Sequence, residues 1–175
     1  MGFLRIVLDN IRNMKRAKKI RNMDIADLLA LEDEELYDAV ECVCCDAIVD
    51  IADADVTEEQ KLVYSLMRLE AEVNNGGLCQ FFVNSSGECA PYISKALDAI
   101  GADKMKSLFD SFILENHIDV NDLSSFKIES IEEYEKQTER FDFDSFDDAF
   151  YEDEYFHQQI IDYVRKNIAQ IMKQV

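Results

Sequence analysis

Hydrophobic residues recur every three or four positions along most of the chain, which is the period of an amphipathic α-helix. Leu36, Val40, Val43 and Ala47 form one such stripe, and residues 62–73 form another. One proline and five glycines in 175 residues leave little scope for sharp turns. The pattern predicts an all-α fold, a single-domain compact bundle of about seven helices.

Capping signals place the ends of several helices. Thr57 and Gln60 have the spacing of a capping box, Pro91 suits the first turn of a helix, and Gly101 suits a C-terminal cap. Asp103 can cap a further helix. The ranges predicted to be helical are 3–23, 25–31, 34–51, 57–73, 91–101, 103–116, 128–140 and 155–173, with a short segment at 78–83 and a loop at 118–126.

The net charge of −19 is concentrated in two regions, and the first runs from Asp24 to Gln60 without any Lys or Arg. An apolar stripe passes through this run, so it is predicted to fold with its acids on the opposite face. A face of one sign repels nucleic acid and attracts a basic partner. The acids predicted to form this surface are Glu34, Glu35, Asp38, Glu41, Asp46 and Asp50. They span roughly 25 Å of helix, or one charge per about 4 Å, against about 3.4 Å for one DNA strand.

A second acidic row would be needed to imitate a duplex, and residues 142–154 can supply it. Its members are Asp142, Asp144, Asp147, Asp148, Glu152, Asp153 and Glu154. Seven aromatic residues interleave with these acids between Phe141 and Phe156. Two interpretations stay open: the rings cover the core while the acids remain solvated, or the aromatic residues anchor a protein partner. The acids of both rows can equally be the ordinary surface of a soluble acidic protein.

Residues 1–23 differ in charge from everything that follows, with seven basic residues and one acid. Leu4, Val7, Ile11 and Met14 form an apolar stripe among the basic residues. We predict a separable basic amphipathic helix (1–23) and an all-helical acidic domain (24–175). The helix is expected to pack on the body or to self-associate, and the alternative is a helix on a membrane surface. Stable membrane insertion is not expected, because no apolar run approaches about 20 residues.

Five cysteines are an odd number, and Cys42, Cys44 and Cys45 lie on one predicted helix. Adjacent cysteines on a helix point in different directions, so free, mostly buried thiols in a reducing cytoplasm are the simplest interpretation. The cysteines and the two histidines have no recognisable metal-binding spacing. No metal and no cofactor are predicted.

The segment from Asn74 to Gly87 gathers amides, hydroxyls and glycines around two aromatic residues. The residues singled out are Asn74, Asn75, Gly76, Gly77, Gln80, Phe81, Asn84, Ser85, Ser86 and Gly87. We interpret it as a helix–turn–helix corner in which Asn74 and Asn75 bond backbone groups. The alternative is a polar pocket for a small molecule, with or without an enzymatic activity. An enzyme is not expected, since Ser85 and Ser86 have no Lys or His nearby in sequence to activate them.

The same segment carries a resemblance to a known family. The run EVNNGGLCQFF at 72–82, with NSSG at 84–87 and ALDAIGA at 96–102, resembles the bacterial DNA-mimic protein nineteen-like family. LYDAV at 36–40 and FDDAFY at 146–151 fit the same pattern. The resemblance covers about residues 36–163 and leaves out the basic helix. It implies an all-helical fold and, in the family's named member, a homodimer whose acidic surface imitates DNA and occupies a DNA-binding regulator.

These observations together predict a cytoplasmic acidic interaction protein, a DNA mimic that binds and inhibits a basic DNA-binding protein. The partner is expected to be a DNA-binding regulator or a nuclease, and direct nucleic-acid binding is not expected. An immunity protein that blocks a nuclease toxin would use the same surface. Alternatives from other classes are the small-molecule or enzymatic domain at the Asn74–Gly87 corner, and a membrane adaptor that uses the basic helix.

Overall fold

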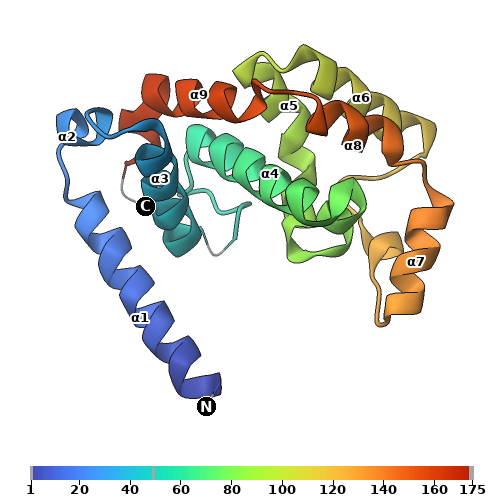
Figure 1. Ribbon diagram of the computed structural model, residues 1–175, viewed down its shortest axis with the longest axis horizontal. Helices are drawn as coiled ribbons and strands as arrows, with labels where there is room; N and C mark the ends of the chain where they lie inside the picture. The colour runs from blue at the N-terminus through green and yellow to red at the C-terminus, as the bar shows by residue number, and fades with distance from the viewer. Residues whose placement is uncertain (1, 49, 174–175) are drawn as a thin grey trace. The chain divides into compact units, whose positions relative to one another are not determined.

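The computed structural model describes residues 2–48 and 50–173, with side-chain burial described from residue 12 onward (Figure 1). These residues form nine α-helices and two short 3₁₀ turns and contain no β-strand, which confirms the predicted all-α fold. The helices are α1 (Gly2–Arg21), α2 (Ile25–Leu29), α3 (Asp33–Ala47), α4 (Glu58–Val83), α5 (Ala90–Ile100), α6 (Asp103–Glu115), α7 (Ile131–Arg140), α8 (Asp144–Tyr151) and α9 (Phe156–Ile171).

The chain forms two compact units, one of residues 1–60 and 161–175 and the other of residues 61–160. The boundaries fall within α4 and α9, so each of these two helices contributes residues to both units. The predicted division into residues 1–23 and 24–175 stays a prediction.

In the first unit, hydrogen bonds to backbone carbonyls join segments that are far apart in sequence. The Arg165 guanidinium on α9 donates to the carbonyls of Leu29 (3.0 Å) and Leu31 (2.9 Å). Gln60 Nε2 donates to the carbonyl of Ile171 at 2.8 Å. Gln60 also completes the predicted capping box, because Thr57 N–H donates to Gln60 Oε1 at 2.8 Å and Gln60 N–H donates to Thr57 Oγ1 at 3.2 Å. Four apolar side chains of α9 are buried in this unit: Ile161, Val164, Ile168 and Ile171.

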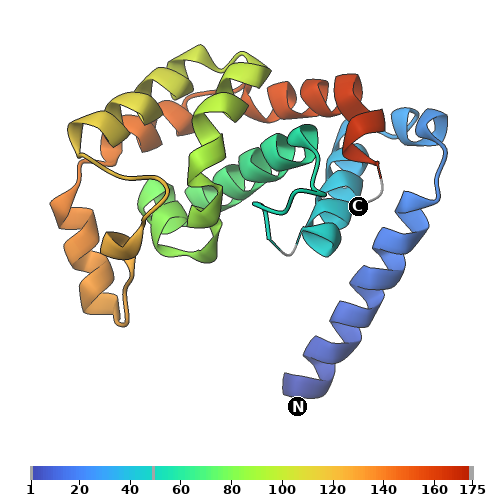
Figure 2. The same cartoon turned by 180° about the vertical axis from the view of Figure 1, so that it is seen from behind.

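The second unit is built around stacked phenylalanines. Phe82 from α4 stacks on Phe126 with ring centroids 4.8 Å apart, and Phe112 from α6 lies 5.0 Å from Phe143. In Figures 1 and 2, α6 lies alongside both α5 and α8. All five phenylalanines between residues 141 and 156 are buried, whereas Tyr151 and Tyr155 are 58% and 72% exposed. The phenylalanine rings therefore cover the core, as the first interpretation expected. The two tyrosine rings lie at the surface, where the second interpretation expected aromatic residues that anchor a partner.

The helix ends follow the predicted caps at Thr57, Pro91 and Gly101, but Asp103 does not cap α6, because Ala102 is the N-cap residue and no side chain caps it. Pro91 lies in the first turn of α5, and Gly101 ends it in the left-handed conformation with φ 76°. The predicted break between the helix at 57–73 and the segment at 78–83 is present, because α4 leaves the helical conformation at Gly76 and Gly77 and is helical on both sides of them. α8 was not predicted as a helix, because its apolar positions were hidden among acids. The side chains of Leu4, Val7 and Ile11 lie outside the described residues, while Met14 is 60% exposed.

Candidate functional site

The predicted corner lies at a kink in α4, where Gly76 and Gly77 leave the helical conformation. Gly77 has a φ of 77°, in the left-handed region that favours glycine. At such a break the carbonyls before it and the N–H groups after it lack helical partners.

Three side chains from α7 and α8 bond the backbone at this kink. Tyr151 Oη donates to the carbonyl of Val73 at 2.6 Å, and Tyr134 Oη donates to the carbonyl of Gly76 at 3.1 Å. Asp147 Oδ1 accepts the N–H of Leu78 at 2.8 Å and so caps the second half of α4. The segments EVNNGGLCQFF and FDDAFY both carry the resemblance to the family. These hydrogen bonds show that the two segments are in contact in the folded chain.

Asp147 thus points inward instead of joining the acidic surface predicted for it. A Cβ atom added at Gly77 would collide with its carboxylate. Burial raises the pKa of Asp147, the Leu78 N–H lowers it, and the neighbouring charges of Asp144 and Asp148 raise it further; the net result is a raised pKa.

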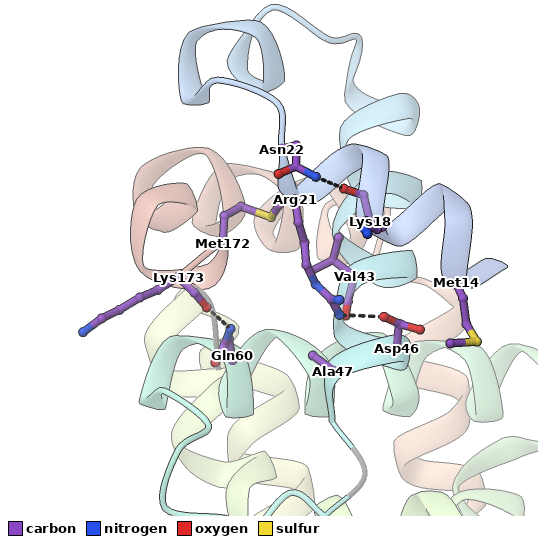
Figure 3. Close-up of a pocket in the computed structure, with 10 residues that line it drawn as sticks. All are labelled: Met14, Lys18, Arg21, Asn22, Val43, Asp46, Ala47, Gln60, Met172 and Lys173. Atoms are coloured by element: carbon purple, nitrogen blue, oxygen red, sulfur yellow. Dashed lines mark hydrogen bonds and ion pairs between the residues drawn. The ribbon is translucent and has the colours of Figure 1, made fainter.

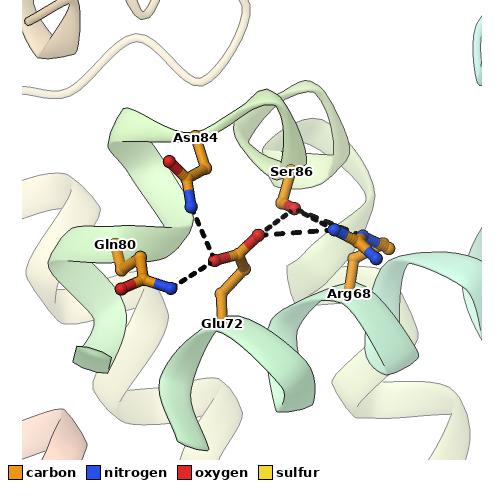
Figure 4. Close-up of polar contacts among 5 residues, drawn as sticks. All are labelled: Arg68, Glu72, Gln80, Asn84 and Ser86. Carbon is orange, nitrogen blue, oxygen red and sulfur yellow. Dashed lines mark hydrogen bonds and ion pairs between the residues drawn. The ribbon is translucent and has the colours of Figure 1, made fainter. Parts of the chain in front are cut away.

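On the other side of the kink, the buried Glu72 carboxylate accepts hydrogen bonds from several side chains (Figure 4). Oε2 accepts from Gln80 Nε2 and Asn84 Nδ2, each at 2.8 Å. Oε1 accepts from Ser86 Oγ at 2.7 Å and from the Arg68 guanidinium at 3.4 Å. We call these five residues the Glu72 network. Its donors converge on the carboxylate from α4 and the turn that follows it.

The network sets the charge state of Glu72. Burial raises the pKa of this carboxyl group, but the hydrogen bonds from Ser86, Gln80 and Asn84 and the charge of Arg68 outweigh burial and lower it below its ordinary value. Each bond to the carboxylate stabilises the ionised form. Glu72 therefore serves as a buried anion that holds the turn after α4 against the helix.

The residues that lock the corner are partly different from those expected. Asn74 and Asn75 are exposed on α4, and the structure shows no side-chain hydrogen bond from either among the residues it describes. The locking donors are Gln80, Asn84 and Ser86. Phe81 and Gly87 are buried, and Ser85 is exposed. A Cβ atom at Gly87 would lie 3.0 Å from the Phe82 carbonyl, so glycine permits close packing there.

A further contact within the second unit joins α4 to α9. His157 Nδ1 lies 2.9 Å from Glu70 Oε1. Sequence spacing gave no signal for this pair, since the two residues are 87 positions apart.

A cavity of about 360 Å³ opens beside the corner. Its polar lining comes from Asn84, Ser85, Glu88, Asn121, Asp122, Ser124 and Lys127. Its described lining has neither His nor Cys. The described residues contain no group of three His, Cys, Asp or Glu side chains arranged to hold a metal ion. The cavity offers hydrogen-bonding groups together with the charges of Glu88, Asp122 and Lys127.

Five of the six acids predicted for the first surface lie on α3 and Asp50 lies beyond its end, and basic residues of α1 reach two of the five. Glu34, Glu35, Asp38 and Asp50 are exposed, while Glu41 and Asp46 are half-buried. Arg21 forms an ion pair with Asp46 at 2.8 Å, and Arg16 lies 3.8 Å from Asp38. The basic helix thus neutralises part of the predicted acidic face.

The acids of the second unit include a row that no described basic residue pairs with. Asp144, Asp148 and Glu152 are exposed and four positions apart, so they share one side of α8 and its C-terminal cap. Asp142 and Glu154 are exposed as well. Asp153 is half-buried and accepts the N–H of Tyr155 at 3.0 Å.

Comparison with protein families matches residues 54–167 to the model of the DMP19-like proteins. The chain belongs to the DMP19-like family. The match includes the kinked helix α4, the Glu72 network and α8, and it begins after α3, so that α1 to α3 lie outside it. Comparisons with curated proteins and with solved structures found no match. In the described part of this DMP19-like protein, no helix has both the length and the apolar character needed to cross a membrane.

Proposed function

We propose that this DMP19-like protein is an acidic interaction protein that binds a basic DNA-binding protein in the place of DNA. The observation that carries the proposal is the exposed acidic row of Asp144, Asp148 and Glu152, flanked by exposed Tyr151 and Tyr155. This row lies inside the family match, unlike the acids of α3.

The spacing of the row suits a groove lined by Lys and Arg. Residues four apart on a helix are separated by roughly 6 Å along its axis, so the row presents a regular series of like charges. Exposed tyrosines beside such charges supply the aromatic anchors that are enriched at protein interfaces. A net charge of −19 opposes direct binding to DNA, which is itself a polyanion.

The acids of α3 and the homodimer implied by the resemblance belong to the same proposal. A second acidic row, from α3 or from a second copy of the chain, would raise the density of negative charge toward that of a DNA duplex. A duplex carries one charge per roughly 1.7 Å of helix axis. Cytoplasmic localisation is proposed with it. The corner has less support as a catalytic or ligand-binding site, because four donors already occupy the Glu72 carboxylate.

The test is an affinity pull-down with the tagged full-length chain, followed by binding measurements on the recovered partner. Asp144→Asn, Asp148→Asn and Glu152→Gln in one protein should weaken binding at least about tenfold, mainly through slower association. A matched control removes three exposed acids elsewhere in the unit: Asp98→Asn, Asp103→Asn and Glu115→Gln. Duplex DNA should compete with the wild-type chain.

Equal weakening by both triple variants would mean that only net charge matters. Simultaneous binding of DNA and this protein to one partner would contradict the DNA-mimic role. Recovery of a nuclease, with loss of its activity in the complex, would identify the immunity-protein version of the proposal.

A further inference from the structure

We propose that α1 is a displaceable cover on the acidic face of α3. α1 occupies this face within its own chain, and the basic helix of a partner binds there only after α1 has left. The inference rests on the proposed function, because it names the kind of segment that these acids accept and how access to them is controlled.

The contact between α1 and α3 is complementary in charge. Arg21 bridges the C-terminal part of α3, pairing with Asp46 at 2.8 Å and donating to the carbonyl of Val43 at 3.3 Å (Figure 3). A second cation, Arg16, faces Asp38. The fold therefore already contains one basic helix seated on these acids.

Few of the described side chains of α1 are buried in the same contact. Among the described side chains of α1, Ala17 and Ile20 are buried and the others are half-buried or exposed. Cavities of about 520 and 570 Å³ flank the contact, and Met14 and Asp46 line both. Close-packed side chains supply most of the stabilising contacts between helices, and the described side chains of α1, which begin at residue 12, contribute two buried residues to this packing.

Of the two ion pairs, Arg21–Asp46 is the better shielded, with side chains 25% and 23% exposed, whereas Arg16–Asp38 adds little to this hold. The Arg16 and Asp38 side chains are 54% and 61% exposed, and exposed pairs contribute little because water and salt screen them. Within the same unit, α9 buries four aliphatic side chains, and its Arg165 is fixed to the carbonyls of Leu29 and Leu31. The described part of α1 therefore buries fewer apolar side chains than α9 does.

The displaced helix defines what can replace it. Arg16 and Arg21 lie on either side of Ala17 and Ile20, so the face toward α3 carries two cations around a small apolar patch. An amphipathic basic helix has this character. Such helices are common where proteins bind DNA, which connects the cover to the proposed class of partner.

The first experiment uses the chain's own helix as the probe. A fluorescent synthetic peptide of residues 2–23 is titrated with the full-length protein and with Ala17→Glu, which places a charge at the buried centre of the contact. The control is Lys19→Gln, which changes the net charge equally at an exposed position of α1. Affinity scales with the fraction of molecules whose face is open, so Ala17→Glu should bind the peptide at least about tenfold more tightly than the wild type or the control.

A second experiment closes the face instead of opening it. Cys42 Sγ lies 3.9 Å from the carbonyl oxygen of Asn13, so Asn13→Cys in a Cys45→Ser background should form an intramolecular disulfide on oxidation. The oxidised protein should bind the peptide more weakly than the same protein after reduction. This comparison introduces no charge into the contact between α1 and α3. It can therefore be made even if the Ala17→Glu variant does not fold.

Equal affinities for Ala17→Glu, Lys19→Gln and the wild type would overturn the proposal, as would equal affinities before and after reduction. Failure of the disulfide to form, or its formation between two copies, would contradict a cover held within one chain. Neither experiment uses a DNA-binding partner, so the failure of the proposed function would be seen separately in the pull-down.

Discussion

Gly77 is the single residue on which the kink in α4 depends most directly. Its positive φ and the nearby Asp147 carboxylate both oppose a side chain. Gly77→Ala should therefore lower the free energy of unfolding by about 2–4 kcal/mol, combining backbone strain with displacement of a buried cap. Chemical denaturation of the purified protein measures this loss.

Gly101→Ala is the matched control for this prediction. Gly101 has nearly the same φ, 76°, but a Cβ atom there would meet nothing within 4 Å. Gly101→Ala should lower the free energy of unfolding by only about 1 kcal/mol, because it adds backbone strain without a collision. Equal losses at the two positions would show that contact with Asp147 contributes nothing.

Glu72 gives a prediction about pH. Its pKa in the folded protein lies below its ordinary value of 4.5, so its stabilising effect is complete above that value and is lost as the pH falls through the folded pKa. Glu72→Gln should destabilise the protein by about 1–3 kcal/mol at neutral pH, because the four donors around it, including buried Ser86, lose a charged acceptor. The difference between variant and wild type should shrink as the pH falls below about 4.5.

Denaturation series at several pH values measure that difference, and Glu88→Gln is the control because Glu88 is exposed in the adjacent turn. The control should follow the wild type at every pH. A Glu72→Gln deficit that stays constant down to acid pH would mean that the lost stability comes from packing and not from the charge of the carboxylate.

At the scale of elements, α8 closes the kink of α4. Asp147→Ala removes the acceptor of the Leu78 N–H and should destabilise the protein by about 1–3 kcal/mol. Asp148→Ala changes the same residue type at the next position, which is exposed, and should cost less than about 0.5 kcal/mol. Native-state hydrogen exchange should show faster exchange of the Leu78 amide in the first variant only.

The helices and their caps could be predicted from the sequence because those signals are local. Thr57 with Gln60, Pro91 and Gly101 each act within one turn of the helix that they start or end. α8 was missed because its acidic residues suggested a solvated segment, although Phe146 and Phe150 are spaced as on one buried helix face.

The partners of the kink could not be found by local reasoning. Leu78 and Asp147 are 69 positions apart, and Val73 and Tyr151 are 78 apart. Only the three-dimensional structure brings these pairs together. The same holds for the direction of Asp147, which in sequence is one acid among many, and for the exposure of Asn74 and Asn75.

For the whole molecule, the excess of 37 acidic over 18 basic residues predicts self-repulsion in the folded state. Like charges on a compact surface destabilise it relative to an expanded chain. Added NaCl shortens the screening length from roughly 30 Å at 0.01 M to about 8 Å at 0.15 M, so the melting temperature should rise over this range.

The sign of this salt effect decides between repulsion and attraction. Pairs such as Arg21–Asp46 and Arg165–Asp33 would weaken with salt, and a falling melting temperature would show that they dominate. The variant with Asp144→Asn, Asp148→Asn and Glu152→Gln removes charges for which no ion pair is described. Calorimetry at low and physiological salt should therefore show a smaller salt-induced rise for this variant than for the wild type. If the melting temperature of the variant rises with salt as much as that of the wild type, the repulsion arises elsewhere on the surface. That result would weaken the case that this row presents a concentrated negative charge to a basic partner.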